Sequence, residues 1–354
     1  MDQRSFDYWE FFAGEARRIG APLYERLSQG IGSDEGLREF ANGARAGQPR
    51  ANVLFAAVHF LLLRGAQHPL RRFYTNLGGS APGEDPFPVF KDFVETHRAA
   101  LAPLIASRVT NTNEVGRSAL LAPAFRVLAE EAGEPLHLIE LGPSAGLNLV
   151  WDRYGVRYTR GDEAFSLDVP EATLTLECAL RGEKLPPLGP APAVASRVGL
   201  ERNPMDRSDP DARDWLKALV WPDQVSRFAQ LEIALETISH DTPEIRSGDT
   251  LALLPDALAE VPRDQPVCVY HTMVIYQFNE EMREALDAIL IVASLRRPVW
   301  RISLECTLSG DNPLLLYSYR DGNKEKRTLA LCHPHGAWLE WIGQKIVIPG
   351  RAMR

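Results

Sequence analysis

The chain has 354 residues, of which 45% are hydrophobic and 24% are charged, a composition typical of soluble globular proteins. Its formal net charge of -8 argues against a nucleic-acid partner, because backbone phosphates repel an acidic surface. The four cysteines lack C-x-x-C spacing, which predicts reduced thiols and no metal site. The apolar run Val53–Leu63 is too short to cross a bilayer, and the first residues lack a secretory pattern. We therefore expect a cytoplasmic protein with no membrane partner.

The first third of the chain has helical periodicity almost throughout, from Ser5 to about Glu131. An all-helical lead of this length predicts a cap or substrate-selecting domain at residues 1–125, followed by a second domain at 126–354. On the apolar face of one of these helices, His59 is expected to be a core histidine with satisfied hydrogen bonds. The helical stretches are expected at Asp34–Phe40, Asn52–Arg64, Asp85–Ser107 and Ala119–Ala129.

A polar segment, TNTNEVGRS at residues 110–118, precedes the last of these helices. Two interpretations are open. The segment is rich in residues that cap helices, and Glu114 suits a first helical turn. Alternatively, Glu114 and Arg117 lie near a ligand loop, where they offer a carboxylate and an anion clamp.

The stretch Leu136–Gly155 organises the rest of the chain. Its apolar start, Leu136–Leu141, predicts a buried parallel strand, and a helical pattern begins at Leu147. Between them, Gly142, Ser144 and Gly146 alternate with other residues, which predicts a tight turn that approaches a ligand closely. The same letters also form the G-x-S-x-G motif of a hydrolase nucleophile elbow, and a turn that binds nothing is the third interpretation.

Beyond this turn, strand and helix patterns alternate after an insertion at about residues 155–196, which has one strand-like run, Thr173–Leu180, and a second half too rich in proline for regular structure. Asp321-Gly322 predicts a closing hairpin, and the apolar spacing from Trp338 to Ile342 suggests a terminal helix. The arrangement predicts an α/β fold with a Rossmann-like sheet of about seven strands. After the first strand, the expected strands are Arg197–Pro204, Pro243–Arg246, Pro266–Tyr270, Val299–Leu304, Leu314–Tyr319 and Arg327–Leu331.

The segments ELGPSAGLNLVWDRY, VGLERNP and IRSGDTLALLP resemble the first three cofactor motifs of class I S-adenosylmethionine-dependent methyltransferases, in the same order. Longer blocks, among them TNTNEVGRSALL and HPHGAWLEWIG, are similar to a family of bacterial proteins carried as a domain of unknown function. That similarity covers nearly the whole chain. It implies a seven-stranded methyltransferase-type sheet with a helical N-terminal cap, and S-adenosylmethionine as cofactor.

The resemblance also assigns residues. Glu201 holds the ribose hydroxyls, and Asp249 accepts a hydrogen bond from the adenine amine. The methionine portion is lined by Glu140, Gly142, Pro143, Ser144, Ala145 and Gly146. Asn148 and Asn203 complete the expected cofactor-binding set. The candidate catalytic residues are His271, Glu114 and Arg117, with His271 as general base and Arg117 as clamp for a small polar or anionic metabolite.

Two alternatives remain open at this point. The first is a degenerate protein that has the same turn and binds a nucleoside cofactor but catalyses no reaction. A serine hydrolase would use Ser144 with Asp249 and either His271 or His335, but the helical lead supplies no upstream strand for an oxyanion loop. The sequence identifies neither the methyl acceptor nor an oligomeric state. The cysteines Cys306 and Cys332 are expected to be core thiols.

Overall fold

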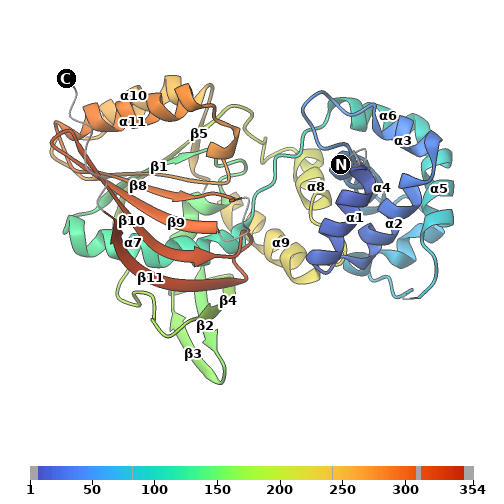
Figure 1. Ribbon diagram of the computed structural model, residues 1–354, viewed down its shortest axis with the longest axis horizontal. Helices are drawn as coiled ribbons and strands as arrows, with labels where there is room; N and C mark the ends of the chain where they lie inside the picture. The colour runs from blue at the N-terminus through green and yellow to red at the C-terminus, as the bar shows by residue number, and fades with distance from the viewer. Residues whose placement is uncertain (1–6, 82, 241, 308–311, 347–354) are drawn as a thin grey trace, which may run out of the picture. The chain divides into compact units, whose positions relative to one another are not determined.

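The computed structural model describes residues 7–81, 83–240, 242–307 and 312–346. The chain divides into two compact units (Figure 1). The first, called the helical unit here, comprises Met1–Thr112 and Asp206–Glu232. The second, the sheet unit, comprises Asn113–Met205 and Ile233–Arg354. The expected division into a helical cap or substrate domain at residues 1–125 and a second domain at 126–354 stays a prediction.

Short polar side chains start several helices of the helical unit. Asp7 accepts from the backbone N–H groups of Trp9 and Glu10, and Asp34 accepts from that of Leu37, so each carboxylate satisfies donors that a helix start leaves free. The helices are α1 (Tyr8–Arg18), α2 (Pro22–Gly32), α3 (Glu35–Ala41), α4 (Arg50–Leu63), η1 (Pro69–Phe73), η2 (Thr75–Leu77), α5 (Phe87–Thr96), α6 (Arg98–Ser107), α8 (Pro210–Ala218) and the first half of α9 (Val225–His240).

Helix α4 is the core of the helical unit, because ten of its fourteen residues are buried. The Phe55 ring stacks on Tyr24 at 4.3 Å between ring centroids. The later segment 206–232 closes this core, with the Phe12 and Trp221 ring centroids 5.3 Å apart. Asp223 also accepts the N–H of Leu23 at 3.2 Å. A helical excursion between two strands of the sheet unit therefore completes the N-terminal helical core.

The sheet unit contains one eleven-stranded sheet, in the order β3-β2-β4-β11-β10-β9-β8-β7-β1-β5-β6. Its strands are β1 (Leu136–Leu141), β2 (Gly155–Arg160), β3 (Glu163–Leu167), β4 (Thr175–Arg181), β5 (Val194–Glu201), β6 (Glu244–Ser247), β7 (Val267–Thr272), β8 (Val299–Leu304), β9 (Asn312–Arg320), β10 (Asn323–Cys332) and β11 (Trp338–Ile346). Its helices are η3 (Val115–Arg117), α7 (Ser118–Ala132), η4 (Leu147–Arg153), α10 (Thr250–Glu260), η5 (Ile275–Gln277), α11 (Glu280–Ser294) and the second half of α9.

Five neighbouring strands, β6-β5-β1-β7-β8, run parallel. Strand β1 lies in the middle, and the chain moves outward on one side through β5 and β6 before it returns to the other side as β7. The direction of winding therefore reverses between β1 and β7. In open α/β sheets, ligands bind beyond the carboxyl ends of the strands at such a reversal.

Helices cover both faces of these parallel strands (Figure 1). Ile139 and Leu141 of β1 pack in one buried cluster with Leu254 of α10 and Leu286 of α11. Successive residues of a strand point to opposite faces, so Leu138 and Glu140 face the other side. That side is covered by α7, because its Phe125 contacts Tyr270 of β7 edge to face at 5.3 Å. We call these the α10–α11 face and the α7 face.

The expectation of a seven-stranded methyltransferase-type sheet is wrong, because the sheet has eleven strands and several antiparallel pairs. The predicted hairpin at Asp321-Gly322 is present, and both residues have positive φ as a two-residue hairpin turn requires. The expected helix at Trp338–Ile342 is instead part of β11, which pairs with β10 and β4. The insertion at 155–196 contributes β2, β3 and β4.

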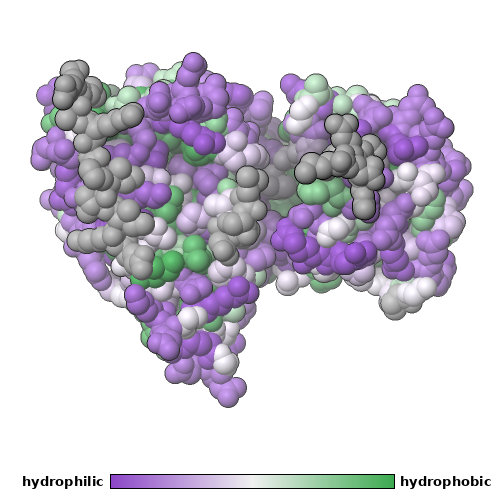
Figure 2. Space-filling view, in the orientation of Figure 1, coloured by the Kyte–Doolittle hydropathy of each residue, from purple (hydrophilic) through white to green (hydrophobic). Residues whose placement is uncertain are grey.

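The visible face of both units is largely hydrophilic, with apolar residues in small separate groups (Figure 2). Within the described ranges, no helix is long and apolar enough to cross a membrane.

Candidate functional site

The turn after β1 has an unusual backbone. Gly142 and Gly146 have φ values of 66° and 84°, and Ser144 between them has a φ of 54°. A serine in this left-handed region is strained by roughly 1–2 kcal/mol, and such residues concentrate at functional sites. A Cβ on Gly142 would lie 2.7 Å from Cγ2 of Val274, so the turns after β1 and β7 are in contact. The sequence motif therefore forms a tight, strained turn at the reversal between β1 and β7.

Glu201, at the end of β5, holds this turn in place. Its Oε2 accepts the N–H of Ser144 at 3.0 Å, and its Oε1 accepts the N–H of Asn203 at 3.0 Å. The carboxylate is 8% exposed. Pro143 packs against the same strand, since a Cβ on Gly199 would lie 2.5 Å from Cγ of Pro143. The two sequence motifs that were expected to share a cofactor thus lie side by side.

A buried polar chain lies beneath the turn on the α7 face. The Tyr270 hydroxyl is 3.2 Å from Oε2 of Glu140 and 3.1 Å from the Asn148 carbonyl oxygen. Burial raises the pKa of Glu140 to about 8, although the Tyr270 hydrogen bond and the Arg117 charge oppose the shift. A protonated Glu140 can donate to the Tyr270 hydroxyl, which in turn donates to the Asn148 carbonyl. With a neutral Glu140, both hydroxyl protons therefore have an acceptor.

The Asn148 side chain is fully buried on the same face. Its Oδ1 accepts from the Ser118 hydroxyl at 2.8 Å. Among the described residues, its Nδ2 has no hydrogen-bond partner. A buried amide that lacks a partner costs about 1–3 kcal/mol, which a ligand or water can recover.

The polar segment before α7 belongs to this region. The N–H of Leu147, at the start of η4, donates to Oδ1 of Asn113 at 3.1 Å. Glu114 is buried, accepts the N–H of Gly116 at 3.3 Å, and lies 3.2 Å from Nδ1 of His335. The two interpretations of this segment are therefore compatible, because Glu114 caps η3 and also lies in the polar region.

Arg117 is held by backbone groups. Its Nε donates to the Pro334 carbonyl at 3.0 Å, and its Nη1 lies 3.4 Å from the Thr272 carbonyl and 3.3 Å from the Thr272 hydroxyl. The loop of Pro334 packs tightly here, since a Cβ on Gly336 would lie 2.1 Å from the Gly116 carbonyl oxygen. A guanidinium fixed in this way lies ready to hold an anion without paying the entropy of ordering a mobile arginine.

His271 and Glu305 form a second buried arrangement. Nδ1 of His271 lies 2.7 Å from Oε1 of Glu305, which also accepts the N–H of Val274 at 3.1 Å. Burial lowers the pKa of His271, against the effect of Glu305. Burial acts to raise the pKa of Glu305, but the hydrogen bond from His271 and those from the Val274 region outweigh it and hold that pKa below its usual value. The pair is therefore a neutral imidazole oriented by a carboxylate.

The second nitrogen of His271 is buried and unpaired in the described part of the chain. Nε2 has no hydrogen-bond partner among the described residues, and the ring is 1% exposed. An imidazole with Nδ1–H bound to a carboxylate presents Nε2 as a proton acceptor, which is the arrangement of a general base. Met273, two residues later, has a φ of 58°, a second strained non-glycine residue at the same reversal.

The expected catalytic residues are divided between the two faces. Register pairs Glu140 with Tyr270 and Leu141 with His271, so His271 shares the α10–α11 face with Leu141. Glu114 and Arg117 contact groups on or beside the α7 face. The contact between Val274 and Gly142 connects the two arrangements at the strand ends.

Two expected cofactor residues have other contacts. Asp249 is exposed, and its Oδ1 accepts the N–H groups of Leu251 and Ala252 at the start of α10. Its Oδ2 pairs with Arg202 at 2.8 Å, and this hydrogen bond and the capping bonds lower its pKa. Asn203 is exposed and contacts Glu201 through its backbone. Ala145 is fully buried and small enough for the turn.

Sequence reasoning missed Glu305, Tyr270 and the role of His335. Glu305 follows β8 directly, and a carboxylate just past a buried strand is the signal that could have identified it. In the described part of the chain, no group of three or more His, Cys, Asp or Glu side chains could hold a metal ion. Cys332 is buried as expected, whereas Cys306 is exposed and not a core thiol.

These features define an α/β protein with a polar region at the carboxyl ends of its parallel strands. The chain belongs to the family described as "Uncharacterized protein conserved in bacteria (DUF2332)", whose model matches residues 7–341. The expected membership of a bacterial family of unknown function is thereby confirmed. No curated protein and no solved structure matches the chain.

Proposed function

We propose that the sheet unit binds S-adenosylmethionine beyond the ends of β1, β5 and β7 and transfers its methyl group to a small polar metabolite. The observation that carries the proposal is the bond between Glu201 and the N–H of Ser144. It joins the glycine-containing turn to the carboxylate at the tip of the next strand. A turn and an acidic group placed in this way serve a nucleoside cofactor in open α/β sheets.

The residues present fit the cofactor in part. The Glu201 carboxylate has about four lone-pair positions, of which two backbone N–H groups use two, so it can still accept ribose hydroxyls. The unpartnered Nδ2 of Asn148 offers a buried donor. The Asp249 carboxylate fits less well as the adenine partner, because a helix start and Arg202 already use both of its oxygens.

When bound, S-adenosylmethionine supplies a methyl group activated on a sulfonium. The residues of this chain then have to orient the acceptor and take its proton. We assign proton removal to Nε2 of His271, with Glu305 as the positioning residue that fixes the Nδ1–H tautomer. Arg117 and Glu114, which are buried and held by several bonds, are assigned to the polar groups of the acceptor.

Calorimetry with S-adenosylmethionine and S-adenosylhomocysteine tests the proposal. Binding of both is expected, and the matched control is Glu177→Gln, which removes an exposed carboxylate on β4 and should leave affinity unchanged. If neither compound binds below millimolar concentration, the cofactor assignment fails. Binding without methyl transfer into metabolite extracts would instead support the non-catalytic cofactor-binding alternative.

A serine hydrolase is the second candidate, because Ser144 has the strained backbone of a nucleophile elbow, with a φ of 54°. In this reading His271 is the base, and Glu305, not Asp249, is the acid bound to it. A fluorophosphonate probe distinguishes the two candidates. Labelling that disappears in Ser144→Ala would replace methyl transfer with hydrolysis, whereas an unlabelled Ser144 is expected if its role is to form the turn.

A further inference from the structure

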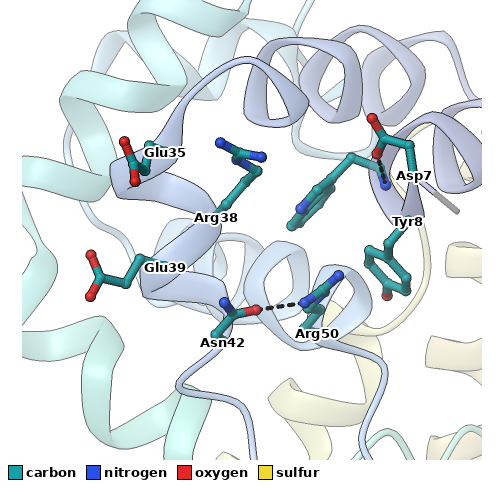
Figure 3. A pocket seen from close by; sticks show the side chains of 8 residues that line it. Asp7, Tyr8, Glu35, Arg38, Glu39, Asn42 and Arg50 are labelled. Carbon is teal, nitrogen blue, oxygen red and sulfur yellow. Dashed lines mark hydrogen bonds between the residues drawn. The ribbon is translucent and has the colours of Figure 1, made fainter. Parts of the chain in front are cut away.

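A pocket of about 540 Å³ lies on the helical unit, apart from every residue discussed above as a site residue. Its lining comes from the first turn of α1, from α3 and from the start of α4 (Figure 3). Pockets of this size hold small organic ligands. The lining residues are Asp7, Tyr8, Trp9, Glu35, Arg38, Glu39, Asn42 and Arg50.

One wall of the pocket is fixed before any ligand binds. Nη1 of Arg50 donates to Oδ1 of Asn42 at 2.6 Å, and the Arg50 guanidinium lies 4.2 Å from the centroid of the Tyr8 ring. The Tyr8 hydroxyl in turn accepts the N–H of Ala51 at 3.2 Å. Because a guanidinium has five N–H donors, Arg50 keeps donors for a ligand in an orientation that is already set.

Arg38 supplies a second cation from α3. Within the described residues, no carboxylate lies in ion-pair distance of it, although Glu35 and Glu39 are its neighbours on the helix. Figure 3 shows the Arg38 side chain extending toward the first turn of α1, whereas the Glu35 and Glu39 carboxylates lie at the opposite end of the pocket. The third carboxylate of the lining, Asp7, lies at the α1 end, where its Oδ1 accepts the N–H groups of Trp9 and Glu10 (Figure 3). That end therefore has two guanidinium groups against one carboxylate that already caps a helix, whereas the end of Glu35 and Glu39 has two carboxylates.

The charges select the class of ligand. The lining carries two arginines and three carboxylates, so a polyanion is repelled and a simple anion gains little. A molecule with an anionic group at one end and a cationic group at the other satisfies both ends of the pocket. From this separation of charge we infer that the helical unit binds a small zwitterion, with its carboxylate between Arg38 and Arg50 and its ammonium near Glu35 and Glu39.

A series of ω-amino acids, from glycine to aminohexanoate, tests this inference with the full chain and calorimetry. Affinity should peak at one chain length, because only one spacing of the two charges matches the pocket. Hexanoate and hexylamine, which each keep one charge, should bind at least about tenfold more weakly than the best zwitterion. Arg38→Gln should weaken that zwitterion about tenfold, since Arg38 is exposed and its loss leaves the fold intact.

Arg45→Gln is the matched control, because Arg45 is also exposed near α3 but does not line the pocket. This variant should bind the best zwitterion as tightly as the unaltered chain does. Arg50→Lys keeps the charge but loses the fork-shaped donor, and it should also bind more weakly. Three results would overturn the inference: no binding of any member up to about 10 mM, equal binding of hexanoate, or equal effects of Arg38→Gln and Arg45→Gln.

Discussion

Two buried histidines, one in the middle of α4 and one at the end of β7, show how differently the two units use the same side chain. His59 is fully buried, and both ring nitrogens have partners: the Ala218 carbonyl at 3.0 Å and the Asn76 amide at 2.9 Å. His271 is equally buried, but among the described residues only its Nδ1 has a hydrogen-bond partner. Burial lowers the pKa of both rings. Burial and a lowered pKa are therefore common to both rings, and the difference that supports the proposed role of His271 is its Nε2, which has no partner among the described residues.

The largest expected effect comes from exchanging these two histidines for asparagine. His271→Asn should lower the rate of methyl transfer about 10²- to 10⁴-fold, because it removes the proton acceptor. His59→Asn should cost about 1–3 kcal/mol of unfolding free energy through lost hydrogen bonds and should leave the rate per folded molecule unchanged. Transfer of label from S-adenosylmethionine into metabolite extracts and urea unfolding measure the two quantities. Equal rates for the two variants would remove the distinction between the histidines.

The fold could be predicted where a segment is apolar on both faces. The bounds expected for β1 and β8 agree with the structure residue for residue, because Leu136–Leu141 and Val299–Leu304 are buried on both sides. The position of His59 in a satisfied core site was also predicted from the apolar face of its helix. Local patterns were sufficient in these places because burial, and not a distant partner, decides the conformation.

Other elements depend on partners that are distant in the sequence. Trp338, Leu339, Trp341 and Ile342 have helical spacing, yet they form β11 because β10 and β4 supply hydrogen-bond partners on both sides. Similarly, Glu305 was missed because its importance comes from the His271 ring, 34 residues away. The turn at Gly142–Gly146 was identified because its glycines, which readily adopt positive φ, indicate such a turn without reference to distant residues.

The buried carboxyl of Glu140, which is hydrogen-bonded to Tyr270, provides the next test of the polar groups at the strand ends. Its folded-state pKa of about 8 lies above the ordinary value of 4.5, so the folded chain keeps a proton that the unfolded chain releases. Stability is therefore unaffected below pH 4.5 and is lost progressively as pH rises through 8. The side chain in Glu140→Gln does not ionise. Relative to that of the unaltered chain, the free energy of unfolding of this variant should therefore rise on the order of 3–5 kcal/mol between pH 5 and 8. The free energy of unfolding of both chains is measured with urea at several pH values. A difference between the two that stays constant from pH 5 to 8 would contradict the assignment.

Glu201 tests the polar region through ligand affinity. Glu201→Ala should lose about 1.5–3 kcal/mol of binding free energy for S-adenosylmethionine, because a carboxylate that accepts ribose hydroxyls is removed. The same change frees the N–H of Ser144 and loosens the turn, so thermal unfolding has to be measured beside calorimetry. Glu201→Gln keeps an acceptor and should lose less. Unchanged affinity in both variants would place the ribose elsewhere.

The smallest effect is expected at Asp249, which lies at the tip of the neighbouring strand β6 and sharpens the contrast with Glu201. Its Oδ1 accepts two N–H groups of α10, and its Oδ2 pairs with Arg202, with the Arg202 side chain 65% exposed. Asp249→Ser retains a side-chain oxygen that can cap the helix, so stability should change by less than about 1 kcal/mol. Affinity for S-adenosylmethionine should fall by less than about threefold, because the carboxylate is already engaged in the protein. A loss comparable to that of Glu201→Ala would show that Arg202 gives way and that Asp249 does hold the adenine amine, as the sequence motif predicts.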